Sequence, residues 1–373
     1  MSFNSLPDNN RLVNITQTVI KIIGFIAVLY LFLLSIQMMG VSFKLFGKDF
    51  AESMMTMTSN PFVGLFIGIL ATSIIQSSST TTSILVGLVA GGVIPLTNAI
   101  PMVMGANIGT SITNTIVSLG HVTKREEFRR AFAGAIVHDF FNLIAVIVLL
   151  PLELIFHLIE KSALFMTTLF VNVGGFNFIS PLKIFLNPTI DFIKTQVPLP
   201  IPLLIFSFIL LFLSLGLLVK LMKSLIIGRI EILIDSYLFK NIGTAFILGI
   251  ILTAIIQSSS VTTSLVVPLV GAGILTVKKI YPYTLGANLG TTITAILAAL
   301  VTSEAVAISV AFSHLLFNIF GIIIITTVFR TLPITLAEKF SAICSNKRWL
   351  ALVYVAVTFF IIPLILITLT KNI

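Results

Sequence analysis

Charge is scarce in this chain, because only 9% of its 373 residues are Asp, Glu, Lys or Arg, whereas 57% are hydrophobic. An average soluble domain has about 25% charged residues. The mean hydropathy is correspondingly high, at +1.14. This composition excludes an ordinary soluble domain and indicates a protein that is embedded in a lipid bilayer.

Cysteine is almost absent, with Cys344 as the single example. One cysteine excludes an internal disulfide and a cluster of thiolate metal ligands. Cys344 lies in the polar stretch Cys344-Ser-Asn-Lys-Arg, which we expect to be a loop, with no special role for the thiol.

Negative charge is the scarcer sign, since 13 acidic residues stand against 22 basic ones and give a net charge of +9. In a soluble protein this excess would suggest binding to nucleic acid. Here the Lys and Arg residues lie between apolar runs, where membrane orientation and anionic headgroups explain them better. We therefore expect the lipid bilayer as a partner and no nucleic acid.

Apolar runs of membrane-spanning length are abundant. The clearest cover 22–40, 131–151, 201–222, 306–329 and 350–370. About 20 apolar residues are enough for a helix to cross a bilayer. The first run follows a polar N-terminal stretch, and no small-residue cleavage site comes after the run. The run therefore predicts a first membrane span rather than a removed signal peptide. The fold class is therefore predicted as an all-α polytopic membrane protein.

An internal repeat is the most informative feature. The segment 68–83 recurs 181 residues later at 249–264, and about half of the aligned positions match through 113 and 294. Each copy contains Gln-Ser-Ser-Ser, at 76–79 and 257–260, inside apolar sequence. Duplicated hydrophobic units that Gly and polar residues interrupt at matching positions are typical of the central site of a secondary transporter.

Each copy predicts the same elements in the same order. A span and an interfacial segment precede a re-entrant helical hairpin with the motif at its tip, for which two tilted spans are the alternative. A Gly-Ala-Asn span and a His-x-x-Phe-Asn span follow. The expected units are a cytoplasmic segment (1–19), the first inverted repeat (20–159), an irregular extracellular linker (160–200), the second inverted repeat (201–330), and a cytoplasmic loop with an extra C-terminal span (331–373).

Basic residues indicate opposite orientations for the two copies. The segment 124–130 after the first Gly-Ala-Asn span holds two Lys or Arg pairs, whereas the loop after the second, 302–304, has none. Lys278 and Lys279 instead precede the second span. Because Lys and Arg mark cytoplasmic loops, this exchange predicts inverted repeats.

Oxygen atoms dominate the chemistry of the repeat cores, since 68–113 and 249–294 contain no Asp, Glu, His or Arg. Hydroxyl and carbonyl oxygens suit sodium, and amides at the N-termini of broken helices suit an anion. We expect substrate and sodium to bind at Gln76, Ser77, Ser78, Ser79, Thr80, Thr81, Asn107, Thr110, Gln257, Ser258, Ser259, Ser260, Thr262, Asn288, Thr291 and Thr292. Sodium is assigned to Gln76, Ser77, Gln257, Ser258 and backbone carbonyls.

A packing role competes with the binding role for these side chains. Ser and Thr in membrane helices often donate to the carbonyl four residues back, and Asn often joins helices. Packing explains the duplicated clusters poorly, but it stays open for Asn107 and Asn288. As accessory residues we consider His138, Asp139, Asn142, His314 and Asn318. His138, Asp139 and His314 are expected to be hydrogen-bonded interior groups. Asp139 has no match in the second copy, so among them this membrane-embedded carboxylate is the first candidate for a functional role.

At these motifs the chain resembles the type II sodium-dependent phosphate cotransporters. That family is marked by inverted repeats that each contain Gln-Ser-Ser-Ser, and the stretches 104–116, 137–142 and 285–300 are also similar. The resemblance covers about residues 20–330. It implies sodium-driven import of inorganic phosphate through the plasma membrane, in a bacterium the inner membrane. It also implies substrate and sodium sites at the two hairpins and no cofactor beyond sodium as coupling ion. A homodimer stays open.

Other functions fit parts of the pattern. A sodium-coupled transporter of sulfate or a carboxylate would have the same architecture, whereas a channel or scaffold would not need two matching hairpins. A membrane-embedded serine hydrolase would use one of Ser77 to Ser79 with His138 or His314 as base. That chemistry needs one activated serine with one oriented base, and two equal clusters argue against it.

Overall fold

The structure is a computed structural model that describes residues 8–173, 175–233, 241–302 and 304–370. The regular structure of these residues is helical throughout, which confirms the all-α class. Six helices among them are long and apolar enough to cross a membrane: Val19–Phe46, Arg125–Phe156, Pro200–Leu221, Val277–Thr302, Ala305–Val328 and Trp349–Leu369. Each of the five apolar runs matches one of them, with at most one residue beyond the end of the helix.

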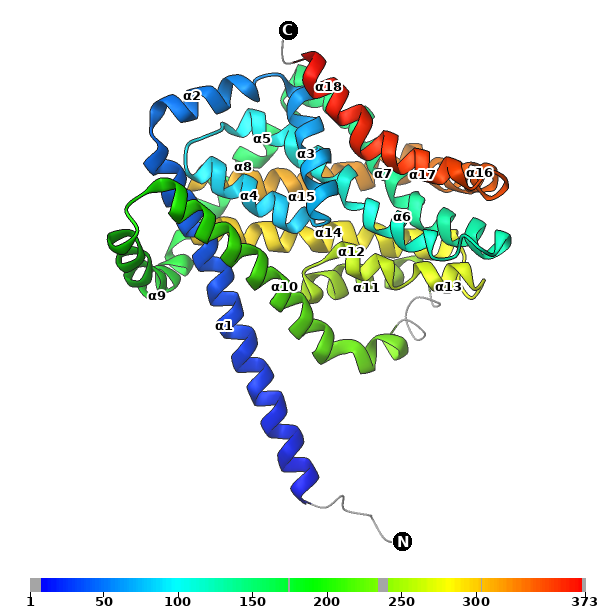
Figure 1. Ribbon diagram of the computed structural model, residues 1–373, viewed down its shortest axis with the longest axis horizontal. Helices are drawn as coiled ribbons and strands as arrows, with labels where there is room; N and C mark the ends of the chain where they lie inside the picture. Colours follow the sequence, from blue (N-terminus) through cyan, green and yellow to red (C-terminus); the bar gives the residue numbers. More distant parts are fainter. Residues whose placement is uncertain (1–7, 174, 234–240, 303, 371–373) are drawn as a thin grey trace.

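The helices of the first half are α1 (Asp8–Phe46), α2 (Lys48–Met57), α3 (Pro61–Ile75), α4 (Ser78–Ala90), α5 (Leu96–Thr110), α6 (Ile112–Leu119), α7 (Arg125–Phe156), α8 (Leu158–Asn172) and α9 (Gly175–Gln196). The second half contains α10 (Pro200–Leu233), α11 (Ile242–Ile256), α12 (Ser259–Ser264), α13 (Val267–Gly271), α14 (Val277–Thr302), α15 (Ala305–Val328) and α16 (Leu332–Asn346). The chain ends in α17 (Trp349–Ala356), a π-helical turn (Val357–Ile361) and α18 (Ile362–Thr370). The N-terminal half of α1 projects away from the other helices (Figure 1).

The segments that flank the Gln-Ser-Ser-Ser motifs are short. Helix α3 has 15 residues and α4 has 13, which corresponds to about 22 and 20 Å at the usual helical rise. Helix α11 also has 15 residues. Because a full span needs about 20 apolar residues, these lengths favour hairpins over pairs of complete spans.

The two copies differ at two breaks. The second arm of the first hairpin is the continuous α4, whereas in the second copy this arm is divided into α12 and α13. Pro268 stands there in the place of Gly87, and proline removes a helical N–H donor. Conversely, the first Gly-Ala-Asn segment is interrupted at Ser111, whereas α14 is continuous.

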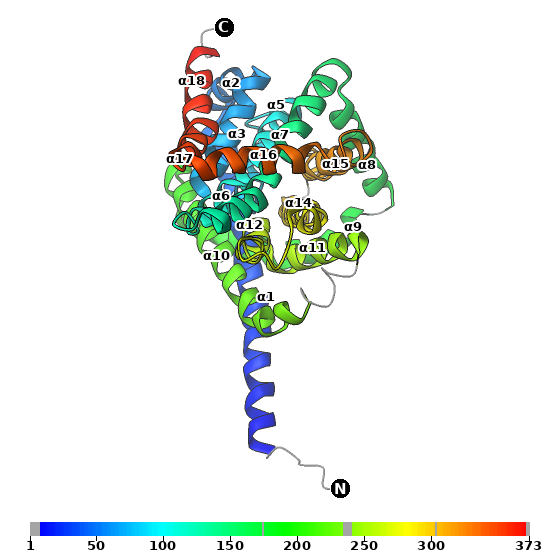
Figure 2. The ribbon, with the colours of Figure 1, turned by 90° about the vertical axis from the view of Figure 1, so that its right-hand side faces the viewer.

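Glycines allow the same close packing in both copies. A Cβ atom on Gly105 would lie 2.0 Å from the carbonyl oxygen of Leu65, and one on Gly286 would lie 2.0 Å from that of Phe246. Only glycine permits such an approach of two helix backbones. Helix α5 therefore packs directly on α3, and α14 packs on α11 (Figure 2).

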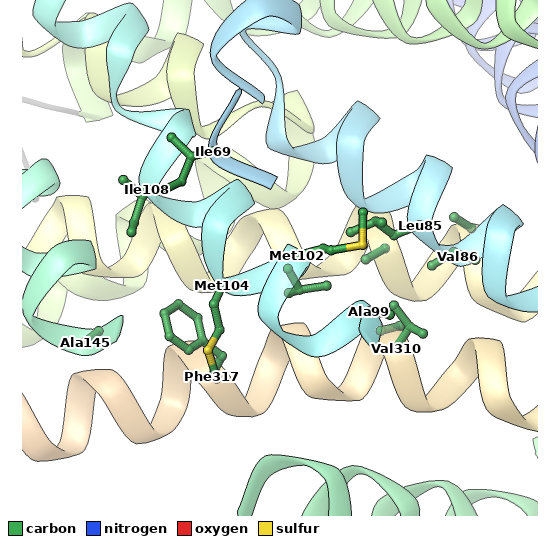
Figure 3. Close-up of a cluster of buried hydrophobic side chains, with 14 of the residues drawn as sticks. Ile69, Leu85, Val86, Ala99, Met102, Met104, Ile108, Ala145, Val310 and Phe317 are labelled. Atoms are coloured by element: carbon green, nitrogen blue, oxygen red, sulfur yellow. The ribbon is translucent and has the colours of Figure 1, made fainter. Parts of the chain in front are cut away.

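The apolar core surrounds these contacts. Figure 3 shows side chains from α3, α4, α5, α7 and α15 that meet in one cluster. Met104 of α5 and Phe317 of α15 are completely or almost completely buried there. The Gly-Ala-Asn segment of the first copy is thus held in the centre of the molecule by apolar packing on several sides.

The prediction of an irregular linker at 160–200 is wrong. Helices α8 and α9 cover most of it, and α9 contains Pro188. The break before α10 falls at 197–199, where Pro198 and Pro200 follow each other closely. Pro200 begins α10, a position where a helix has no use for the missing N–H.

The loop expected after residue 330 is also largely helical. Helix α16 buries Pro333, Ala337, Ser341 and Cys344, and spacings of three and four residues place these side chains on one face. Cys344 is therefore fully buried rather than part of an exposed loop. Burial raises the pKa of its thiol to about 11. Of the N-terminal segment 1–19, residues 1–7 lie outside the described part, and the rest begins α1.

Candidate binding site at the two hairpin tips

The motif glutamines reverse the chain at both hairpin tips. Gln76 has a φ of 57° and Gln257 a φ of 59°. Each backbone N–H donates to a threonine carbonyl, that of Thr72 or Thr253, at 2.7 Å. Residues with a side chain seldom adopt this left-handed conformation. The two copies therefore share this chain reversal, and strained residues of this kind gather at functional sites.

The serine after each glutamine caps the next helix. The Ser77 hydroxyl accepts from the Thr80 N–H at 3.2 Å, and the Ser258 hydroxyl accepts from the Val261 N–H at 3.3 Å. Serine is a preferred N-cap because it satisfies an N–H that lacks a helical acceptor. The N-terminus of α4 at the tip carries partial positive charge, which favours an anion nearby.

The two tips meet, although they are far apart in the sequence. The Ser79 hydroxyl donates to the Gln257 carbonyl at 3.2 Å. The Ser260 hydroxyl donates to the Thr110 carbonyl at 3.4 Å. The side chains of Asn114 and Thr263 hydrogen-bond at 2.8 Å. The fold thus brings both motifs and the end of α5 to one place. Helices α4 and α12 both contact α14, and Figure 1 shows α12 directly beside α14.

The two glutamine side chains differ in exposure. Gln76 is exposed, whereas Gln257 is 7% exposed. Within the described chain, the Gln257 Oε1 atom has no hydrogen-bond partner. A buried amide oxygen normally finds a partner, so this atom is available to a ligand.

Matched hydroxyls without partners lie in both copies. The side-chain oxygens of Thr72 and Thr253 are buried and lack a hydrogen-bond partner among the described residues, and those of Thr113 and Thr294 do so as well. Each pair is separated by the repeat distance of 181 residues. Sequence reasoning missed all four, although their repeat spacing was a usable signal. Buried polar atoms without protein partners commonly contact bound water or ions.

Several predicted ligands also hydrogen-bond within their own helix. Thr81, Thr110, Thr262 and Thr291 donate to the carbonyl four residues back, Thr292 donates three residues back, and Thr80 donates to the Ser77 hydroxyl. This pattern is the packing role of hydroxyls in helices. Their oxygens keep acceptor capacity, so the bonds do not prevent contact with a cation. Ser78 and Ser259 are buried in the first turns of α4 and α12.

The asparagines of the Gly-Ala-Asn and His-x-x-Phe-Asn motifs join the two copies crosswise. Asn288 of α14 donates to Asn142 of α7 at 3.0 Å and accepts from His138 of the same helix. Asn318 of α15 donates to Asn107 of α5 at 3.3 Å. Asn142 also donates to the Asn107 carbonyl at 2.7 Å. All five are buried, so Asn107 and Asn288 act here as links between helices.

Asp139 and His314 are buried beside this network. One Asp139 oxygen accepts from Tyr354 at 2.9 Å and from Thr115 at 3.3 Å, and the other has no partner in the described part of the chain. Tyr354 belongs to the extra C-terminal span, and no motif marked it in the sequence. His314 is interior, as expected, but neither ring nitrogen has a described hydrogen-bond partner.

The hydrolase hypothesis gains no support from this geometry. His138 donates to Asn288, and no described contact joins either histidine to a serine of the motifs. Asp139 accepts from hydroxyl groups rather than orienting a histidine. A serine nucleophile needs a base within hydrogen-bond reach and a group that orients the base.

Two matching broken helices whose polar tips meet between membrane-length helices have the form of a secondary-transporter site. The chain belongs to the Na⁺/Pi-cotransporter family, whose model matches residues 31–177 and 210–345. This finding confirms the family suggested by the duplicated motifs.

Three relatives illustrate the similarity. Sodium-dependent phosphate transport protein 2B of Pongo abelii is 33% identical over 95% of this chain and 66% of the relative. Protein 2A of Ovis aries is 34% identical over 93% and 67%, and protein 2B of Homo sapiens is 34% identical over 93% and 65%. The chain thus spans about two thirds of the length of these relatives. No solved structure matches it significantly.

Proposed function

We propose that this protein is a sodium-coupled symporter that imports inorganic phosphate across the plasma membrane by alternating access. The meeting of the two hairpin tips, through Ser79 and the Gln257 carbonyl, carries this proposal. It assembles oxygen ligands and a helix N-terminus at one point between the repeats. The printed names of the relatives, which specify sodium and phosphate, support the choice of ions.

Sodium is proposed to bind the oxygens of Gln76, Ser77, Gln257 and Ser258, together with backbone carbonyls. Hard cations prefer such oxygen ligands. The unpartnered Oε1 of Gln257 is the best-supported single ligand. The hydroxyls of Thr72 and Thr253, which precede the two glutamines by four residues, extend this set.

Phosphate is proposed to bind beside sodium because the repeat cores have few cations of their own. Inorganic phosphate is a singly or doubly charged anion near neutral pH, and an unpaired buried charge costs several kcal/mol. Lys278 and Lys279 are the only Lys or Arg residues in 68–113 and 249–294. Bound sodium would supply the missing positive charge, so each ion should raise the affinity for the other.

Inverted repeats are part of the proposal, and two contacts support them. Arg130, the last residue of the basic segment 124–130, donates to the Gly271 carbonyl at the end of the second hairpin. At the other end, Lys44 pairs with Glu304 at 2.8 Å. A small cavity there is lined by both residues and by Ala90 at the end of the first hairpin. Antiparallel copies produce this exchange, and the positive-inside rule assigns the end with Arg130 to the cytoplasm.

Uptake of radiolabelled phosphate into proteoliposomes tests the proposal. A sodium gradient should drive accumulation, and replacing sodium with potassium or choline should abolish it. Uptake that is unchanged by the replacement would refute sodium coupling. Stronger competition by unlabelled sulfate or a carboxylate than by unlabelled phosphate would assign the site to a different anion.

A further inference from the structure

A cavity with both polar and apolar lining lies at the basic end of the molecule, away from the hairpin tips. Its volume is about 350 Å³, and its lining includes Arg129, Arg130, Gly273, Thr276, Glu338 and Ser341. These residues come from the start of α7, the end of the second hairpin, the start of α14 and α16. Helices α13 and α16, which border the cavity, lie on the right-hand side of Figure 1. The volume falls within the range of small-molecule sites, which is about 300–1,000 Å³.

Arg130 is the central cation of this cavity. Its Nε atom donates to the Gly271 carbonyl at 2.9 Å, which uses one of the five N–H groups of the guanidinium. Its side chain lies against Gly273, where a Cβ atom would be 3.5 Å from Nε. Among the residues that the structure describes, no carboxylate forms an ion pair with Arg130. The remaining N–H groups are therefore available to a ligand in the cavity.

Further groups favour an anion at this place. Helix α14 begins at Val277, and the first turn of a helix offers N–H groups without helical acceptors and a partial positive charge. Thr276 and Ser341 add hydroxyls to the lining. Arg129 adds a second guanidinium, which pairs with the exposed Glu126 at 3.1 Å. Such groups recognise a phosphate group through charge-assisted hydrogen bonds.

Basic residues outnumber acidic ones at this end of the molecule, although Glu338 also lines the cavity. The segments 124–130, 278–279 and 338–348 contain nine Lys or Arg residues and three Glu residues. Glu338 itself forms no ion pair with another described residue. The potential over the cavity is therefore positive in spite of this one carboxylate.

We propose that this cavity is a second, regulatory site that binds a phosphate group on the cytoplasmic face. The proposal rests on the proposed transport function for its physiological role. An anion bound to Arg130 and to the start of α14 would hold the end of the second hairpin against α7. It would thereby slow the movement that exposes the tip site alternately to each side. Either free inorganic phosphate, the imported product, or the headgroup of an anionic lipid has the required chemistry.

Sodium-free binding measurements test the site, because the tip site should not hold phosphate without sodium. Purified full-length protein in zwitterionic nanodiscs should bind radiolabelled phosphate, and Arg130→Gln should weaken this binding at least about tenfold. Arg348→Gln, a change at the same end of the molecule but outside the cavity lining, should change it less than about twofold. Arg129→Gln alters an exposed side chain and gives the same test if Arg130→Gln fails to fold.

Two further experiments distinguish free phosphate from a lipid headgroup, and the regulatory site from the transport proposal. If phosphate does not bind but phosphatidylglycerol slows uptake by the unmodified protein and not by Arg130→Gln, the occupant is a lipid headgroup. Gln257→Leu should lose uptake yet keep sodium-free phosphate binding. Uptake therefore tests the transport proposal, and sodium-free binding tests the regulatory site independently of it. The regulatory site is refuted if Arg130→Gln and Arg129→Gln both match the unmodified protein in phosphate binding and in the effect of anionic lipid.

Discussion

At the scale of single residues, the motif glutamines have a backbone role and a side-chain role. Both hold the left-handed turn between two helices, and the Gln257 side chain also has a buried oxygen without a described partner. Glycine accepts the turn without strain but provides no side-chain oxygen. Substitution by glycine therefore separates the two roles better than substitution by a larger residue.

We expect Gln257→Gly to fold in the membrane and to lose phosphate uptake by at least about tenfold, the effect of one lost hydrogen bond to a charged group. Gln76→Gly should likewise fold in the membrane and lose phosphate uptake. The measurement is initial uptake in proteoliposomes, with the thermal unfolding midpoint in detergent as the control for folding. Uptake close to that of the unmodified protein would place the ion site elsewhere.

A second prediction at this scale concerns the hydroxyl of Tyr354, which donates to buried Asp139. Tyr354→Phe leaves this carboxylate with one donor fewer and should destabilise the protein by about 1–3 kcal/mol. Tyr30→Phe is the matched control, because the Tyr30 hydroxyl bonds Thr189 in a less buried place. Equal unfolding midpoints of the two variants would show that the Tyr354–Asp139 hydrogen bond stabilises the protein no more than the Tyr30–Thr189 hydrogen bond does.

At the scale of helices, the two closest backbone contacts depend on glycine. Each repeat packs its Gly-Ala-Asn helix on the first arm of its hairpin, and Gly105 and Gly286 occupy equivalent contacts. Any side chain there must push two helices apart. Since these helices lead directly to the hairpin tips, their separation should also disturb the binding site.

Gly105→Ala and Gly286→Ala should each destabilise the protein by about 1–3 kcal/mol or more, the usual cost of overpacking. Gly216→Ala in α10 is the control, because a Cβ atom there has no neighbour within 4 Å. It should be neutral or slightly stabilising, since alanine favours helix formation. Thermal unfolding in detergent measures all three, and tolerance of alanine at both contacts would contradict the packing described for α5 and α14.

At the scale of the whole molecule, the arrangement of the two repeats decides which loops share a membrane face. Single cysteines at Lys124→Cys and Lys278→Cys should react with an impermeant maleimide from one side, and Lys48→Cys from the other. Labelling of Lys124→Cys and Lys278→Cys from opposite sides would refute inverted repeats. The inverted arrangement also predicts Lys183 and Ser303 on the side of Lys48. The side chain of Lys183 and the whole of Ser303 lie outside the part of the chain that the structure describes.

The native thiol should interfere little with this experiment. Cys344 is buried, and its pKa is raised to about 11. Because the thiolate is the reactive form, labelling of the unmodified protein should stay low at pH 7. It should increase only as the pH rises toward 11, rather than toward the ordinary value near 9. Fast labelling at neutral pH would show that α16 opens in solution.

Composition and repetition in the sequence determined the helical membrane class, the five apolar spans and the family. These features are local, since a bilayer forces each apolar segment to satisfy its own backbone hydrogen bonds as a helix. The duplication also predicted two equivalent hairpins. Their left-handed glutamines and capping serines follow from local backbone geometry and agree between the copies.

Only the tertiary structure decided which distant groups meet. Ser79 reaches the Gln257 carbonyl, and Asn107 and Asn288 bond helices of the opposite copy. Tyr354 bonds Asp139 from the unmatched C-terminal span. The segment 160–200 is mostly helical because its apolar residues pack against other helices. The prolines of this segment had instead suggested an irregular connection. Each of these outcomes depends on packing between segments far apart in the chain, and no local pattern of residues specifies such contacts.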